Sequence, residues 1–184
     1  MRAELDEIVL PERKPALEWI GGRAVQKVSP KYTHAALQGR LTALLSAWAD
    51  GRGRVGPEWR FRLAPPGEAR RPLVPDVAYL SFARLAADAY DAAEEPTIAP
   101  DAAFEILSPG NRRRLMAEKT RVYLAAGAGL VAILDPFART LTVHDGMGAR
   151  TLRGPERLEH AALPGFAPSV DELLGASTLR PPRD

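Results

Sequence analysis

The clearest pattern of apolar and polar positions lies between residues 104 and 126, where a largely apolar segment is followed by an amphipathic one. Residues 104–107 predict a buried strand that is apolar on both faces, apart from Glu105. The following segment has apolar residues at helical spacing, and its inner face is interrupted only by Lys119. That face comprises Leu115, Lys119, Val122, Tyr123 and Ala126. A carboxylate and an ammonium group therefore point inward from neighbouring elements, and such charges are rarely buried without partners. A structural ion pair is one explanation of this pattern, and a catalytic site is another.

The N-terminal half predicts a hairpin, a helix and two further strands. Glycines mark the hairpin turn, and leucines at helical spacing mark the helix. On the last of these strands Asp76 lies on a largely apolar face, as Glu105 does on its own strand. The predicted elements are strands at 17–20 and 23–28 around Gly21-Gly22, a helix at 32–49, and strands at 55–63 and 73–80.

The C-terminal half predicts a surface excursion followed by alternating strands and helices. Its elements are a short helix within 82–100, a strand at 102–107, a helix at 112–126, strands at 130–134 and 141–144, and a short helix at 170–174. Nothing in the sequence resembles a linker or an internal repeat, so we expect a single domain over residues 1–184. The order of elements predicts an α/β (α+β) fold, with a mixed central sheet flanked by helices.

Composition narrows the class of protein. The 184 residues suffice for one domain with a sizeable core, and 46% hydrophobic with 26% charged content is typical of soluble globular proteins. A formal net charge of +2 is not the signature of a strong nucleic-acid electrostatic footprint. With no cysteine, the chain has no disulfide and no zinc site built on thiolates. The N-terminus lacks an apolar signal core and no apolar run approaches the roughly 20 residues of a membrane span, so we expect no membrane partner and a cytoplasmic location.

The inward-facing charged groups are of the types found in metal-dependent hydrolytic sites. Asp76 and Glu105 lie on strands predicted to be neighbours, and two converging carboxylates need a compensating cation. Oxygen ligands suit Mg²⁺ or Mn²⁺, with waters in the remaining positions. A metal there polarises a phosphoryl oxygen and lowers the pKa of a bound water, which Lys119 could orient or deprotonate. This is the composition of a metal-dependent phosphodiesterase site.

An ordered set of short motifs resembles the Uma2 family, also catalogued as a domain of unknown function (DUF820), within the PD-(D/E)xK nuclease-like superfamily. The central motifs are Pro75-Asp76, Glu105-Ile106-Leu107-Ser108-Pro109, Glu118-Lys119, Tyr123-Leu124-Ala125-Ala126-Gly127 and Leu134-Asp135-Pro136. Glu18-Trp19-Ile20-Gly21-Gly22, Ser29-Pro30 with His34, Leu163-Pro164-Gly165-Phe166 and Asp171-Glu172-Leu173 extend the resemblance over nearly the whole chain.

The resemblance implies a restriction-endonuclease-like fold and a Mg²⁺ or Mn²⁺ site. Its ligands would be Asp76, Glu105 and the backbone carbonyl of Ile106, with Glu18 as an additional acidic ligand. The usual motif places a lysine two residues after the glutamate, where this chain has Leu107. Lys119 would supply that ammonium from the helix instead. Leu115 replaces an acidic residue that the family commonly has, which puts a supporting role at that position in doubt.

Further residues are candidates for substrate binding. His34 could hydrogen-bond a site carboxylate or a phosphate, or be a surface or capping histidine. Arg112 and Arg113 could contact a DNA backbone, or be a solvated charge run at a helix start. A homodimer with two sites across a two-fold axis would suit the two strands of a duplex, and Trp19 and Trp59 are candidates for its interface.

The sequence thus favours a metal-dependent endonuclease that hydrolyses DNA phosphodiester bonds. One alternative is a non-catalytic interaction or regulatory module that retains the fold, because fold does not fix function. Another is a glycosidase with two carboxylates. Lys119 argues against the glycosidase, because an ammonium on the inner face would keep both carboxylates ionised.

Overall fold

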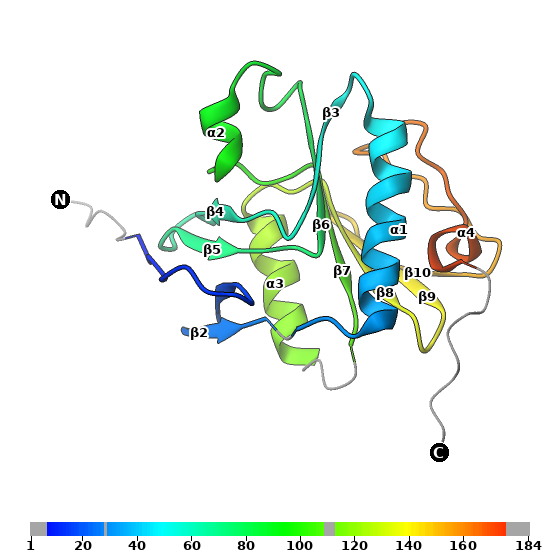
Figure 1. Ribbon diagram of the computed structural model, residues 1–184, viewed down its shortest axis with the longest axis horizontal. Coiled ribbons are helices and arrows are strands. Elements are labelled where there is room, and N and C mark those ends of the chain that lie inside the picture. Colours follow the sequence, from blue (N-terminus) through cyan, green and yellow to red (C-terminus); the bar gives the residue numbers. More distant parts are fainter. Residues whose placement is uncertain (1–6, 28, 109–112, 176–184) are drawn as a thin grey trace.

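A six-stranded mixed sheet forms the centre of the protein, in the order β10-β9-β8-β7-β6-β3 (Figure 1). The computed structural model describes residues 7–27, 29–108 and 113–175. Within these ranges no helix is long and apolar enough to cross a membrane. Strands β7 and β8 are parallel, and the other neighbouring pairs are antiparallel. The strands of this sheet are β3 Gly53–Pro57, β6 Val77–Ser81, β7 Ala102–Ile106, β8 Leu130–Asp135, β9 Thr140–Asp145 and β10 Gly148–Arg153. The remaining elements are β1 Leu17–Ile20, β2 Arg23–Gln26, α1 Tyr32–Ala49, β4 Phe61–Leu63, β5 Arg71–Leu73, α2 Tyr90–Glu94, α3 Arg113–Ala125 and α4 Val170–Leu174.

The two long helices cover opposite faces of the sheet (Figure 1). Buried leucines of α1 pack in one core cluster with Phe104, whereas Tyr123 of α3 packs in the other with Leu80 and Val131. Side chains alternate along a strand, so Phe104 and Ile106 of β7 face α1, and Glu105 faces α3. The mixed sheet, its flanking helices and the N-terminal antiparallel hairpin confirm the predicted fold class.

The strand predicted at 55–63 is wrong, because the chain turns inside it. β3 pairs with β6 in the central sheet, and β4 pairs with β5 in a separate two-stranded sheet. Between them Glu58 has a φ of 51°, a left-handed conformation that extended strands do not contain. Residues 53–63 therefore serve two sheets.

The strand predicted at 73–80 is also interrupted. β5 ends at Leu73 and β6 begins at Val77, so Asp76 lies in the connection. Pro75 within it has no N–H to give to a sheet ladder. Asp76 is therefore not constrained by strand pairing, and its side chain can take its position from other contacts.

The short loop before β8 offers a test of its own packing against Ala162 and the backbone of Asp101. A Cβ at Gly129 would lie 2.8 Å from the Cβ of Ala162 and 2.9 Å from the carbonyl oxygen of Asp101. We expect Gly129→Ala to lower the free energy of unfolding by about 1–3 kcal/mol through overpacking. Gly39→Ala is the control: this exposed position in α1 has nothing within 4 Å of the added Cβ, and the change should stabilise the protein by about 1 kcal/mol. Urea unfolding measures both, and a neutral Gly129→Ala would contradict the packing.

Candidate active site

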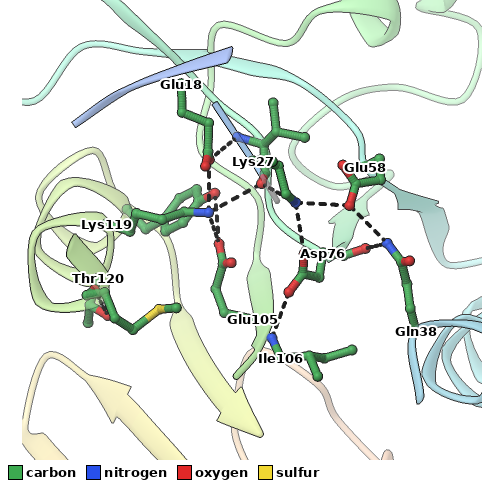
Figure 2. Close-up of polar contacts among 12 residues, drawn as sticks. Glu18, Lys27, Gln38, Glu58, Asp76, Glu105, Ile106, Lys119 and Thr120 are labelled. Atoms are coloured by element: carbon green, nitrogen blue, oxygen red, sulfur yellow. Dashed lines mark hydrogen bonds and ion pairs between the residues drawn. The ribbon is translucent and has the colours of Figure 1, made fainter. Parts of the chain in front are cut away.

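Six buried or half-buried titratable side chains, each from a different segment, line one cavity of about 460 Å³. Figure 2 shows most of them in contact with one another beneath the N-terminal hairpin. They come from β1, the residue after β2, the first turn of α1, the connection before β6, β7 and α3. These residues are Glu18, Lys27, His34, Asp76, Glu105 and Lys119. The three residues that the sequence selected for chemistry, Asp76, Glu105 and Lys119, are thus brought together.

Asp76 is held on both of its carboxylate oxygens. The N–H of Ile106 donates to Oδ2 at 2.7 Å, and His34 Nε2 lies 3.1 Å from the same oxygen. Lys27 Nζ donates to Oδ1 at 2.8 Å. Burial disfavours the charged carboxylate, but the hydrogen bond from His34 and the Lys27 ammonium outweigh it and hold the pKa of Asp76 well below its usual range. Asp76 is therefore an ionised carboxylate with a fixed orientation.

Glu105 and Lys119 form the ion pair that their positions in the sequence suggested. Lys119 Nζ lies 2.6 Å from Glu105 Oε1 and 2.8 Å from Glu18 Oε1, and it donates to the carbonyl of Val74 at 3.3 Å. The hydroxyl of Tyr123 donates to Glu105 Oε1 at 3.4 Å. Both partners are almost fully buried, with exposures of 2% for Glu105 and 5% for Lys119. The ammonium is therefore fixed between two carboxylates.

The electrostatics of this pair are set by burial and by the surplus of carboxylates. Burial raises the pKa of Glu105 to about 7, against the attraction of Lys119 and with the help of the Asp76 charge. Burial alone would lower the pKa of Lys119, but Glu105 and Glu18 outweigh it and raise that pKa. Lys119 is therefore charged. A further cation near Glu105 would favour the ionised form of the Glu105 carboxylate.

Lys27 and Glu58 belong to the site and were missed by the sequence analysis. Lys27 Nζ contacts Glu58 Oε1 at 2.9 Å as well as Asp76, and its side chain is only 11% exposed. The surrounding carboxylates, Asp76 foremost, outweigh burial and raise the pKa of Lys27 above its ordinary value. The signal for Lys27 was its place two residues after the inward-facing Val25 of the hairpin. Glu58 gave no signal, because its position depends on a turn that the pattern did not predict.

The donor set can be tested for its fit to a hard divalent cation. No three acidic or histidine side chains within the described ranges form a ready set of ligands. Mg²⁺ commonly binds through one or two carboxylates and several waters, so Asp76 and Glu105 are enough. The recorded contacts of Glu105 with described residues all fall on Oε1, which leaves Oε2 for the cavity. Asp76 uses three of about four lone-pair sites of a carboxylate. The residues therefore fit such an ion.

The other predicted site residues have different places. His34 makes a hydrogen bond to a site carboxylate, which was one of its predicted roles. Glu18 Oε1 contacts Lys119 Nζ at 2.8 Å and accepts from the N–H of Val74 at 2.8 Å, and its predicted role as an additional metal ligand stays a prediction. Arg112 lies outside the described residues; Arg113 begins α3, and its side chain is not among those described. The N–H of Ile106 orients Asp76, and a role for its carbonyl stays a prediction.

Comparisons with known proteins agree with this fold. The family model Uma2, described as "Putative restriction endonuclease", matches residues 3–171. A crystal structure described as "a putative nuclease belonging to DUF820", from Anabaena variabilis ATCC 29413, is similar at a TM-score of 0.78 and 25% identity, covering 90% of this chain and 93% of that one. No curated protein matches the sequence. Because the family model spans most of the 184 residues, this chain belongs to the Uma2 family.

Proposed function

We propose that the protein is a metal-dependent endonuclease that hydrolyses DNA phosphodiester bonds. The observation that carries the proposal is the convergence of Asp76 and Glu105 on one cavity, with Lys119 Nζ 2.6 Å from Glu105. Two oriented carboxylates and an adjacent ammonium are the groups needed to hold a divalent ion and to balance charge at a phosphate. Membership of a family described as "Putative restriction endonuclease" supports the same reaction class.

The proposed ligands are Asp76, Glu105 and the carbonyl of Ile106, with Mg²⁺ or Mn²⁺ as the ion. The bound ion supplies Lewis-acid stabilisation of the phosphate and a lowered pKa of water. Residues around the ligands fix their orientation: the Ile106 N–H and His34 hold Asp76, and the Tyr123 hydroxyl holds Glu105. Such supporting contacts set ligand geometry before substrate arrives.

Lys119 is the proposed group that positions the attacking water and offsets negative charge in the transition state. The water oxygen adds to phosphorus and one P–O ester bond breaks. The water loses one proton and the leaving oxygen gains one, so the reaction consumes only water. Glu18 is proposed as the residue that positions Lys119, because its Oε1 lies 2.8 Å from the ammonium nitrogen.

The proposal predicts slow, metal-dependent nicking of supercoiled plasmid DNA by the purified wild-type protein. Nicked product should accumulate with Mg²⁺ or Mn²⁺, and EDTA should reduce it to the background of a protein-free sample, because the carboxylates alone cannot stabilise the phosphate charge. Linear and branched DNA and single-stranded RNA, assayed in parallel, define the substrate. If none of these is cleaved above background, the alternative of a non-catalytic interaction module is favoured.

A further inference from the structure

Lys27 is coordinated as a small cation would be. Its ammonium nitrogen lies 2.8 Å from Asp76 Oδ1, 2.9 Å from Glu58 Oε1 and 3.1 Å from the carbonyl oxygen of Val74. An ammonium group has three donors, and each of the three has one oxygen. All three donors of Lys27 are therefore directed at these oxygens, and two of them belong to the carboxylates of Asp76 and Glu58.

The three oxygens are held in place by bonds that do not involve Lys27 (Figure 2). Gln38 donates to Glu58 Oε1 at 3.2 Å, and the N–H of Glu58 donates to the carbonyl of Asp76 at 3.2 Å. Glu58 has a left-handed φ of 51°, which is unfavourable for a residue with a side chain. Such a conformation persists where the surrounding contacts hold the residue in place.

The other two oxygens have their own supports. The Asp76 carboxylate is fixed through Oδ2 by Ile106 and His34. Val74 is fixed through its N–H, which donates to Glu18. The three oxygens thus form a preformed set of ligands, and the Lys27 side chain reaches them from the end of the hairpin.

Asp76 is shared between this position and the proposed divalent ion. Sites that cleave phosphodiesters with two metals hold them about 3.5–4 Å apart, so that a neighbouring cation offsets charge on the second side of the phosphate. Lys27 also lies between two cavities, of about 460 Å³ and 370 Å³, both of which it lines. Loss of its side chain would therefore leave room for a hydrated ion between Glu58 and Asp76.

We infer that Lys27 is a built-in cation that fills the second cation position of the site, at Glu58, Asp76 and the Val74 carbonyl. The protein accordingly holds one divalent ion and one tethered ammonium group in place of two metals. The inference rests on the proposed function, because it assumes that Asp76 and Glu105 bind the first ion. It makes Lys27 a positioning residue, since its ammonium touches ligands and not substrate.

The test is the number of Mn²⁺ ions bound per chain, measured by the electron paramagnetic resonance of free Mn²⁺ during titration. Wild type should bind one equivalent. Lys27→Ala and Lys27→Gln should each bind two, because the vacated oxygens accept a second ion. Lys27→Ala combined with Glu58→Gln should return to one, and Lys27→Arg, which keeps a cation, should stay at one.

The outcomes separate this inference from the proposed function. Two ions in wild type, or one ion in both neutral variants, overturns the inference and leaves the metal-dependent site intact. If wild type binds no ion, the proposed divalent-metal site itself is refuted. If the neutral variants unfold without metal, Mn²⁺ should restore their melting temperature to near that of wild type, and no recovery overturns the inference.

Discussion

Asp76→Asn is expected to reduce metal-dependent DNA cleavage by about 100-fold or more, the scale on which a pre-oriented charge-stabilising group contributes. The amide can still accept the hydrogen bond from the Ile106 N–H, but it carries no charge for a divalent ion. It also removes one of the two carboxylates that contact Lys27. Plasmid nicking measures the first effect, and a Mn²⁺ titration should show that the ion no longer binds.

The fold should survive this change. Lys27 keeps Glu58 and the Val74 carbonyl, so the cost should fall at or below the about 3–5 kcal/mol of breaking a buried ion pair outright. Asp145→Asn is the matched control: this carboxylate on β9, only 7% exposed, contacts His160 and Arg150 and does not line the cavity. An Asp76→Asn protein that cleaves as fast as the Asp145→Asn control would refute Asp76 as a ligand.

Lys119→Met is expected to separate catalysis from metal binding. Methionine keeps the apolar stem against Val122 and Tyr123 and removes only the ammonium. Without metal, Glu18 and Glu105 lose their shared partner, and the free energy of unfolding should fall by about 3–5 kcal/mol. With saturating Mn²⁺ the ion takes over part of that role, so the difference in melting temperature from wild type should shrink.

Cleavage by Lys119→Met should fall by about 100-fold, while Mn²⁺ still binds. Arg121→Met is the control on the same helix: its side chain is 46% exposed, and its pairs with Glu68 and Glu118 should contribute about 0–1 kcal/mol. Turnover at the wild-type rate in Lys119→Met would mean that Lys119 is a bystander and that another group positions the water.

The helices were the most predictable part of the fold. α1 and α4 occupy the residues expected from the sequence, because leucine spacing defines the first and a capping box at Ser169 begins the second. Strand β10 was not predicted, since its residues are mostly exposed and carry no alternation. The breaks at Glu58 and Pro75 were missed because an apolar run does not reveal which sheet each part joins.

The site residues, like the elements of the fold, fall into those that the sequence pattern revealed and those that it did not. Asp76, Glu105 and Lys119 could be found because each is a charge within an otherwise apolar stretch of sequence or helix face, and this signal is local. Lys27 carried only the local signal of its alternation with Val25, and Glu58 carried none, since Lys27 is 31 residues from Glu58 and 49 from Asp76 in the chain. Their role follows only from the turn that aims Glu58 toward the hairpin, which is a property of the assembled structure.

The backbone N–H and carbonyl of Val74 connect segments that leave the ribosome at very different times. Its N–H bonds Glu18, and its carbonyl receives both Lys27 and Lys119. Chains are synthesised at about 5–20 residues per second, so the hairpin emerges seconds before the helix that carries Lys119. Contacts of such sequence separation form late, because their loop-closure entropy must be met first. A nascent chain therefore carries the individual charges well before it carries the site, and any hydrolytic capacity arises only once synthesis has passed α3.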